Sequence, residues 1–581
     1  MLLTILGLMI ILLPFCAVVR FESRLKGFFL IFAVSGAFHL LVALITQATH
    51  TFTYSVILGA HLAASMACLA LAIRGGKTPS KVRLDWFAVS GFLIIFAFLF
   101  SLHFYYTGPV AKTFGTSAVA QSSYTYPFYS DEWIAVSLID YSIENKSLPL
   151  ANPLNDDAPF PNLLVGFHSL VAEVMLLLQL NPLTHYAWLA IVNGALVCLG
   201  AYFVLRLSQT SVFASVLSAM SIPFITNSGN LAGIWYLMPF SLSLMFLLFG
   251  ICGFLLKSKM TMFVSVALSF IIYPPMIVFV TPLLFGMYLY RRSGRLFTWR
   301  ILLFIIALIL ATFLVLKFDI AGMTKWLVRE RQSGGIVSFA IWNVVPVFIL
   351  PLALFGLWDI WKKKNYYILL PTVFGLLFWV VYSFLLFDFI ISPPRVVAIT
   401  SIFFTLTAGF GIDWLYRYLQ KRDHLMLKHL HMHGLKVGVL IAFAGLAVFY
   451  PRISLWQKLA LTVGDADGAK KYMPAPPITR HLSDEDLALF ADIEGKRFIA
   501  PLWKGLVVGV ATHNYPLDSK ASTITNKMLE YDDFMKADCK KKEEYAKKFK
   551  IDFAYTKPFD CKSFAKIGDS SEGFALYRIS L

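Results

Sequence analysis

The chain has 581 residues, of which 58% are hydrophobic and only 14% are charged. A soluble protein of this length would need far more charge on its surface, so the composition excludes an ordinary soluble enzyme. The net charge of +17 does not indicate nucleic-acid binding, because no basic stretch is interleaved with stacking aromatic residues. Excess lysine and arginine in a membrane protein lies mostly in cytoplasmic loops. We therefore expect membrane lipids, and no nucleic acid, as partners of this chain.

Apolar runs of membrane-spanning length follow one another along most of the chain, and they predict a polytopic α-helical membrane protein with about fourteen transmembrane helices. Tyr273-Pro274-Pro275 divides one apolar stretch into two short halves, because proline cannot continue a helix. The spans are predicted at roughly 2–19 (a retained first span), 27–46, 54–73, 86–104, 187–205, 211–227, 237–256, 261–272, 276–290, 300–316, 338–357, 366–387, 396–416 and 436–450.

The basic residues of the loops indicate the orientation. With the N-terminus outside, 22 lysines and arginines up to residue 450 fall in inside loops and seven fall in outside loops, which fits the positive-inside rule. This count requires that Asn162–Leu180, although long enough, does not span. The segment carries His168 and Glu173, which are costly in lipid. We predict a helix that lies in the interface or packs within the protein on the outer side.

The chain divides into three regions by composition. Residues 1–85 hold extra N-terminal transmembrane helices, and residues 86–450 form a membrane domain whose first external loop covers 105–186. Residues 451–581 are mixed in polarity and long enough for one small domain. With the orientation above, this last region lies outside the cytoplasm.

The C-terminal region has the signals of a small α/β domain. Ser483 is predicted to cap a helix whose first turn is acidic. Lys504–Thr512, Phe553–Lys557 and Phe574–Ile579 are typical of short strands.

Six cysteines are present. Four lie inside apolar runs and are read as small core residues. Cys539 and Cys561 lie in the C-terminal region, and outside the cell they are a candidate disulfide pair.

The longest polar interruption of the first 450 residues runs from Tyr126 to Asn162 and carries six acidic residues against Lys146. Within it, Asp131 and Glu132 stand at the start of a predicted amphipathic helix. Acids at this position can simply cap the helix and interact with its dipole. Just outside the membrane, however, a partly desolvated carboxylate could act as a general base. Asp131 is the first choice for this base, and Glu132 would orient the acceptor or sugar, or exchange roles with Asp131.

Three further residues of this loop are weaker candidates. Asp156 and Asp157 are typical of a turn, and if functional they would touch the sugar or a divalent cation. His168 is read as buried and hydrogen-bonded, with a substrate or metal contact as the alternative. The sequence assigns no metal and no cofactor, although a divalent cation is compatible with these acids.

The order of these features resembles the membrane-embedded C-type glycosyltransferases. The acidic pair is followed by a short amphipathic helix, by the proline-rich stretch LPLANP…APFPNLLVGFHSL, and by NPLTHYAWLAIVNGALVCLGAYFVLRLS. Over roughly residues 86–450 this order is similar to that of protein mannosyltransferases, aminoarabinose transferases and mycobacterial arabinofuranosyltransferases. The resemblance implies that the loop acid is the catalytic base and that the donor is a polyprenyl-phosphate sugar. The spans before residue 86 lie outside the shared pattern, and the C-terminal region matches no named subfamily.

A departing lipid phosphate needs a cationic partner. Arg395 stands at the outer start of a predicted span, where arginine is expensive and often functional, and it can bind phosphate with two hydrogen bonds. Snorkelling to the lipid headgroups is the alternative. Members of the resembling superfamily often place an arginine near the start of a late span. Lys325, Arg329 and Arg331 in an outside loop are further candidates, or parts of an interfacial helix.

These observations predict a membrane glycosyltransferase that moves a sugar from a polyprenyl-phosphate donor to a glycan, lipid or protein acceptor in a single inverting displacement. The active site would face outward from a prokaryotic cell membrane. The alternatives are a transporter or flippase of a lipid-linked saccharide and an O-antigen-type ligase or polymerase. Paired broken helices and charged residues across the spans, which a transporter would favour, are not apparent in the sequence.

Overall fold

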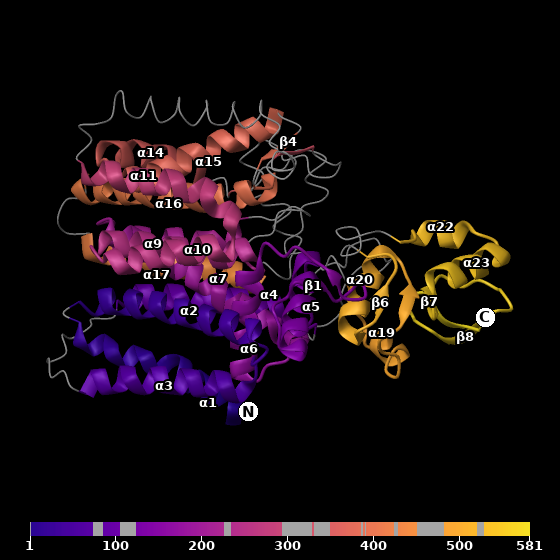
Figure 1. Cartoon of the computed structure of the whole chain (residues 1–581). Coiled ribbons are helices and arrows are strands. Elements are labelled where there is room, and N and C mark those ends of the chain that lie inside the picture. The colour runs from indigo at the N-terminus through magenta and orange to yellow at the C-terminus, as the bar shows by residue number, and fades with distance from the viewer. Residues whose placement is uncertain are drawn as a thin grey trace, which may run out of the picture.

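The computed structural model describes residues 2–21, 23–73, 85–104, 124–225, 234–292, 328–330, 345, 349–384, 387–389, 391–422, 428–449, 481–519 and 528–580. Its helices form one large block, and the C-terminal domain projects from one end of that block (Figure 1). Between the two lies the loop that the sequence predicts to be external, with its helix α5.

The helical block contains most of the secondary structure. Its first part comprises α1 (Leu2–Leu12), η1 (Leu13–Arg20), α2 (Arg24–Ala48), α3 (Tyr54–Ile73) and α4 (Trp86–Phe104). The external loop follows with α5 (Ser130–Asn145), β1 (Ala151–Asn152), β2 (Ala158–Pro159) and α6 (Val165–Leu178). The remaining elements are α7 (Pro182–Leu207), α8 (Val212–Ser221), η3 (Ile222–Phe224), α9 (Pro239–Leu255), α10 (Lys259–Ile272), η4 (Pro274–Met276), α11 (Ile277–Arg291), β3 (Val328–Glu330), α14 (Ile349–Lys362), α15 (Tyr366–Phe384), β4 (Phe387–Phe389), α16 (Pro393–Arg422) and α17 (Lys428–Phe449).

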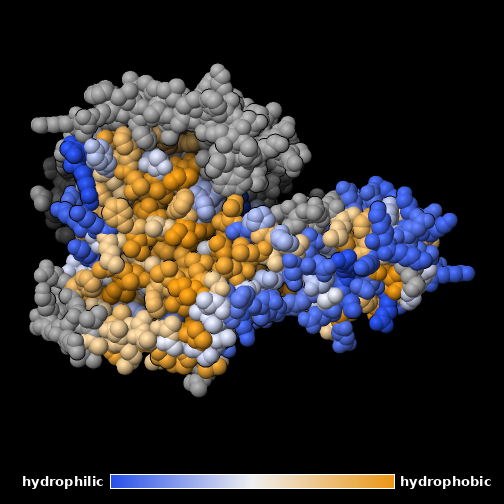
Figure 2. Space-filling model, viewed as in Figure 1, coloured by the Kyte–Doolittle hydropathy of each residue, from blue (hydrophilic) through white to orange (hydrophobic). Residues whose placement is uncertain are grey.

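The surface of the block is that of a membrane protein. Among the described residues, 4 helical segments are long and apolar enough to cross a membrane: α2, α4, α7 and Pro394–Tyr418 within α16. Figure 2 shows an apolar surface over the block, with hydrophilic side chains at the end opposite the C-terminal domain and over that domain itself. The predicted helical membrane fold is thus confirmed, whereas the number of about fourteen spans is not.

Proline determines where two of the predicted spans are interrupted. Within the first predicted span, at 2–19, α1 ends at Leu12 and a 3₁₀ helix containing Pro14 continues the helical segment to Arg20. A proline ring lacks the N–H that would continue the α-helical hydrogen bonding. The predicted break at Tyr273 is confirmed: α10 ends at Ile272, η4 carries both prolines, and α11 begins at Ile277.

The segment on which the orientation depends is a short helix. Helix α6 has 14 residues, about 21 Å of length, which is less than the roughly 30 Å of a hydrocarbon core. Most of its side chains are buried, and it packs against α2 and α5. Of the two predicted arrangements, the structure shows the helix packed within the protein.

The C-terminal domain is a small sheet with helices. Strands β5 (Arg497–Ile499), β6 (Tyr515–Pro516), β7 (Phe553–Thr556), β8 (Phe564–Asp569) and β9 (Ala575–Ile579) form a mixed sheet in the order β6-β5-β7-β9-β8. Helices α19 (Asp484–Leu489), α20 (Leu502–Thr512), α22 (Tyr531–Lys536) and α23 (Cys539–Phe549) accompany it. The predicted strands at 553–557 and 574–579 are confirmed, and so is the cap of α19, where the Ser483 hydroxyl accepts the N–H of Asp486 at 3.1 Å.

One predicted strand of this domain is wrong. Lys504–Thr512 lies in helix α20. A short apolar run does not distinguish a strand from a buried helix, and here tertiary packing decides for the helix. At Gly509 a Cβ would lie 3.0 Å from the Leu154 side chain of the external loop, so this glycine lets α20 approach the loop closely.

Cys539 and Cys561 form a disulfide with their Cα atoms 5.6 Å apart. The bond ties the start of α23 to the segment before β8. Such a link restricts the unfolded chain and therefore stabilises a domain of this size.

A buried lysine, Lys504, joins two acidic residues of the C-terminal domain. The ammonium group of Lys504 donates to Asp486, and to Glu572 at 3.0 Å, while the hydroxyl of Tyr555 donates to Asp486 at 2.5 Å. Burial alone would raise the pKa of Glu572, but the hydrogen bond with His481 and the charge of Lys504 outweigh it and hold that pKa at about 2. A buried ion cluster of this kind is stable only while every member keeps its partners.

We therefore expect Lys504→Met to destabilise the C-terminal domain by about 3–5 kcal/mol, because two buried carboxylates would lose their cation. Thermal unfolding of the purified full chain in detergent, read together with proteolysis of the domain, measures this. Lys547→Met, at an exposed position of α23, is the matched control. Equal melting of Lys504→Met and wild type would contradict the role given to the cluster.

Candidate functional site

The start of helix α5 is fixed by its second acidic residue. The carboxylate of Glu132 accepts hydrogen bonds from the backbone N–H groups of Phe128 and Tyr129, both at 3.1 Å, and from that of Leu237 at 3.2 Å. Only 2% of Glu132 is exposed. Burial raises the pKa of Glu132 to about 8, and the three N–H donors oppose that rise. Glu132 thus caps its own helix and joins it to the segment before α9, and its contacts are those of a positioning residue.

Asp131 points to a different part of the chain. Its Oδ2 atom accepts a hydrogen bond from Nη2 of Arg395 at 3.1 Å, across 264 residues of sequence. The Asp131 side chain is 25% exposed and that of Arg395 32% exposed, so reagents can reach both. The two residues that the sequence proposed separately, one as base and one as phosphate partner, are therefore neighbours in the structure.

Arg395 is held at the beginning of α16. Its Nη1 atom donates to the Ser392 hydroxyl at 2.9 Å, and the guanidinium also interacts with the Tyr273 hydroxyl. Asp131 and Arg395 both lie in the first turn of a helix, and the N-terminal end of a helix carries partial positive charge. Two helix N-termini and a guanidinium thus meet around one carboxylate, an electrostatic setting that attracts an anion such as phosphate.

Of the other three basic candidates, the structure describes only Arg329. Lys325 and Arg331 lie outside the described residues. Arg329 lies in β3, whose antiparallel partner β4 places Asp388 opposite it. Since β4 ends shortly before α16, the backbone at Arg329 belongs to the same region of the fold as Arg395.

The remaining loop candidates are separate from this pair. Asp156 and Asp157 form the turn between β1 and β2 with positive φ angles of 53° each, and Asp156 pairs with Arg497 of the C-terminal domain. His168 is buried, and its Nδ1 accepts a hydrogen bond from the Asn162 amide at 3.0 Å. This contact fixes the loop before α6, as expected of a structural histidine.

A divalent cation at Asp131 would need more than one oxygen ligand. Glu132 cannot supply one, because its carboxylate is turned toward backbone N–H groups inside the protein. Arg395 already occupies the side of Asp131 that a cation would take. Within the described ranges, the residues around Asp131 thus suit an anion better than a metal ion.

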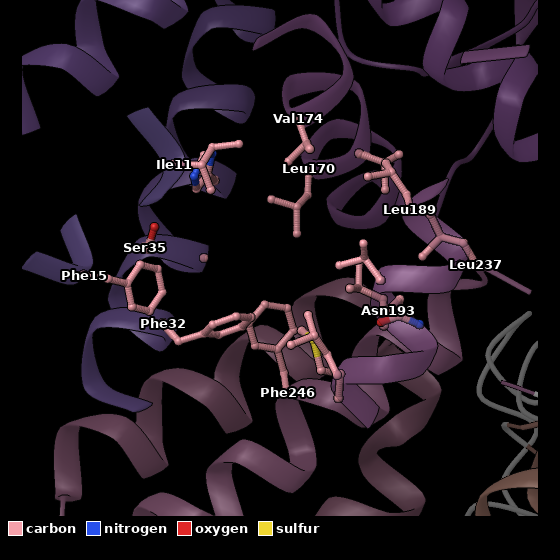
Figure 3. A pocket seen from close by; sticks show the side chains of 17 residues that line it. Ile11, Phe15, Phe32, Ser35, Leu170, Val174, Leu189, Asn193, Leu237 and Phe246 are labelled. Atoms are coloured by element: carbon pink, nitrogen blue, oxygen red, sulfur yellow. The ribbon is translucent and has the colours of Figure 1, made fainter. Parts of the chain in front are cut away.

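An apolar cavity of about 210 Å³ lies between η1, α2, α6, α7 and α9 (Figure 3). Phe32, Leu170, Leu189 and Phe246 line it, and it extends to Leu237, the residue whose N–H group Glu132 accepts. An apolar space of this kind, close to the start of α5, can accommodate hydrocarbon.

A second cavity, of about 230 Å³, lies between α5 and the C-terminal domain. Asp140, Glu144 and Asp157 of the loop line it together with Glu494 and His513 of the domain. The His513 ring lies 3.7 Å from Asp140 and 3.6 Å from Glu144. Helix α5 thus carries the candidate site at its beginning and a contact with the C-terminal domain in its second half.

Sequence patterns alone did not indicate that Tyr273, Ser392 or Leu237 belongs to the site. Tyr273 was treated only as the residue before a proline break. A polar hydroxyl beside such a break in an apolar stretch is a usable signal, because a broken helix end exposes side chains and backbone to a cavity. Ser392 and Leu237 carry no such signal.

This chain resembles some known proteins in structure but not in sequence. No protein-family model and no curated protein sequence matches it. Crystal structures of the Archaeoglobus fulgidus oligosaccharyltransferase resemble this chain. The apo form has 14% identity and a TM-score of 0.46, covering 81% of this chain and 69% of that one.

Two further crystal structures of the same archaeal protein also match. The form tethered to an acceptor peptide has 12% identity and a TM-score of 0.47, with the same coverage of 81% and 69%. The complex with zinc and sulfate has 12% identity and a TM-score of 0.44, covering 85% of this chain and 73% of that one. Values this low establish neither a family nor a function, so the case for function depends on this chain's own residues.

The roles given to the acidic pair predict different outcomes of substitution. Glu132→Ala should destabilise the protein by an amount on the order of 1–3 kcal/mol, because buried N–H groups lose their acceptor. Glu132→Gln should recover part of this loss, since an amide keeps one acceptor oxygen. Asp131→Asn should melt close to wild type, because a partly exposed ion pair contributes little. Thermal unfolding in detergent compares the three, and a large loss for Asp131→Asn with none for Glu132→Ala would reverse the assignment.

The contact between α5 and the C-terminal domain should depend on pH. Burial, and then the neighbouring charge of Glu144, raises the pKa of Asp140 to about 6 from an ordinary value of 3.8, and His513 opposes the rise. The folded protein therefore loses stability as the pH rises between these two values. Asp140→Asn should remove this loss and melt a few degrees higher than wild type near neutral pH, but not at about pH 4. The exposed Asp532→Asn is the control, and a pH-independent difference would count against this account.

Proposed function

We propose that this chain is an integral-membrane glycosyltransferase that uses a polyprenyl-phosphate sugar as donor. The pairing of Asp131 with Arg395 is the observation that carries the proposal. A single displacement at a sugar carbon needs a base for the attacking group and a cation for the leaving phosphate. These two residue types meet beside two helix N-termini, at the end of the helical block that faces the C-terminal domain.

The reaction would proceed with these residues in separate roles. The donor phosphate binds to the Arg395 guanidinium. This group has five N–H donors in a fixed plane and can bind a phosphate with two hydrogen bonds. Phosphate binding draws the guanidinium away from Asp131, and the carboxylate then accepts the proton of the acceptor hydroxyl. The hydroxyl oxygen attacks the anomeric carbon from the side opposite the phosphate, so the bond to phosphate breaks and the configuration inverts.

The surroundings of the pair support this reading. The apolar cavity beside Leu237 offers hydrocarbon contact for the lipid part of a donor. The C-terminal domain contacts the second half of α5, where the second cavity lies between them. A glycan, lipid or protein acceptor bound by the domain could therefore be held next to the site. In the orientation derived from the basic loops, site and domain both lie on the outer face of the membrane.

Substitution of Asp131 tests the proposal. In reconstituted membranes, Asp131→Asn should lower the rate of sugar transfer by about 10²- to 10⁴-fold, the usual contribution of general-base catalysis, while donor binding is retained. Asp157→Asn, at a turn acid away from the pair, should transfer at a near-normal rate. Arg395→Ala should weaken donor binding, and Arg395→Lys should restore it in part.

The same assay separates the alternatives. A flippase of a lipid-linked saccharide should tolerate Asp131→Asn, since moving a lipid requires no base. Full transfer activity of Asp131→Asn would contradict the proposed mechanism.

A further inference from the structure

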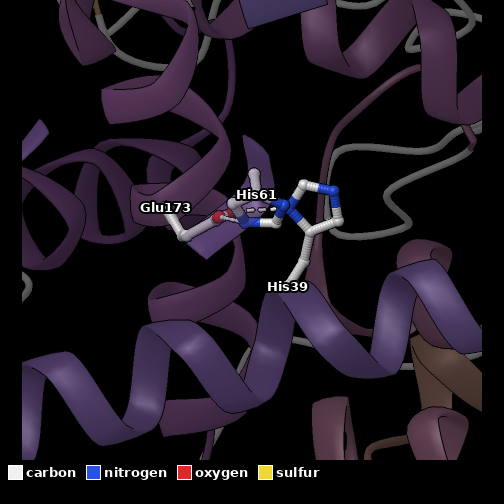
Figure 4. A group of neighbouring side chains, drawn as sticks. All are labelled: His39, His61 and Glu173. Atoms are coloured by element: carbon white, nitrogen blue, oxygen red, sulfur yellow. Dashed lines mark hydrogen bonds and ion pairs between the residues drawn. The ribbon is translucent and has the colours of Figure 1, made fainter. Parts of the chain in front are cut away.

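Three ionisable side chains meet deep in the helical block, away from Asp131 and Arg395. His39 lies on α2, His61 on α3 and Glu173 on α6 (Figure 4). Nδ1 of His39 lies 2.7 Å from one oxygen of the Glu173 carboxylate, and Nε2 of His61 hydrogen-bonds the other. The two imidazole rings stack with centroids 4.1 Å apart. The exposed fractions are 6%, 4% and 0%, so the cluster is shielded from solvent.

The proposed function does not account for this cluster. Two of its members belong to residues 1–85, the region outside the family resemblance. Ionisable residues among apolar helices are expensive and seldom present without a role. The histidines are separated from Glu173 by 134 and 112 residues, so the fold brings the three together from three different elements.

We propose that His39, His61 and Glu173 bind a zinc-class divalent transition-metal ion. Two imidazole nitrogens and one carboxylate are a set that zinc uses in proteins, with a fourth position left for water or another ligand. The ligand atoms all lie within 4.8 Å of one another. Zinc holds such ligands at about 2.0–2.2 Å, so small side-chain rotations bring all three onto one ion.

The donor set also excludes the common alkaline-earth ions. Magnesium and calcium require mostly oxygen ligands, whereas imidazole favours zinc and neighbouring transition metals. Charge supports the same choice. A dication offsets the negative charge of the carboxylate and accepts the lone pairs of two imidazole nitrogens.

The position of the cluster indicates what the ion would do. It would join α2 and α3 to α6, and α6 packs against α5, the helix that begins at Asp131. His39 also lines the apolar cavity described above. Next to the cluster, the Ser169 hydroxyl donates to Gln47 at 2.6 Å and extends the polar contacts between α6 and α2.

Metal content of the purified full chain tests the proposal without any activity assay. After treatment with a chelator, addition of Zn²⁺ and dialysis, elemental analysis should find a single tightly bound zinc ion in wild type. The content should fall to near zero in His61→Ala and Glu173→Gln. Co²⁺ in place of Zn²⁺ should give the visible absorption of a tetrahedral site in wild type, a measurement that needs no variant. Zn²⁺ should also raise the melting temperature of wild type but not of His61→Ala.

Two controls make the result specific. His50→Asn changes an exposed histidine just beyond α2 and should keep the ion. His513→Ala removes the histidine of the second group, Asp140, Glu144 and His513, and should keep it too. Loss of zinc in His513→Ala alone would place the ion at the domain contact and overturn the proposal. Wild type that binds no zinc and gives no tetrahedral cobalt spectrum would show that the cluster is hydrogen-bonded only.

Discussion

The placement of the candidate site depends on one buried carboxylate. Glu132 accepts hydrogen bonds from three backbone N–H groups in two parts of the chain, and leaving such a buried donor without an acceptor costs about 1–3 kcal/mol. The Asp131–Arg395 pair is partly exposed and is worth only about 0.2–1 kcal/mol. The helix start is therefore held by Glu132, and the ion pair beside it can open for a ligand at small cost. A site that must exchange one anion for another benefits from this division between adjacent residues.

Much of this site could be anticipated from the sequence, but its assembly could not. Asp131 stood out as an acid just outside an apolar run, and Arg395 as an arginine at the start of one. Their contact spans 264 residues, and no local pattern encodes which loop meets which helix end. The distinct role of Glu132 was also hidden, because successive residues of a helix point about 100° apart and only packing decides which of them faces inward.

The errors in the fold have the same origin. The valines of Lys504–Thr512 favour a strand by local preference, but the segment is buried between the domain and the external loop, where a helix fits. Of the cluster of His39, His61 and Glu173, only one member could be singled out from the sequence. Glu173 was noticed as costly in an apolar helix, whereas His39 and His61 each lie singly in long apolar runs that give no sign of convergence. A carboxylate among apolar helices needs partners, but only the folded chain shows which residues they are.

Helix α5 connects the candidate site to the C-terminal domain. It has 16 residues, a length of about 24 Å, with buried hydrogen bonds at its start and charged contacts to the C-terminal domain in its second half. The His513 contacts at 3.6–3.7 Å are long and partly exposed, and exposed ion pairs contribute little. The hydrogen bonds of Glu132, at 3.1–3.2 Å, are shorter than these contacts and are buried. Other contacts complete the attachment: Arg497 pairs with Asp156, and the apolar core of the helical block continues into the domain. An acceptor held by the domain would therefore lie in a fixed position relative to Asp131.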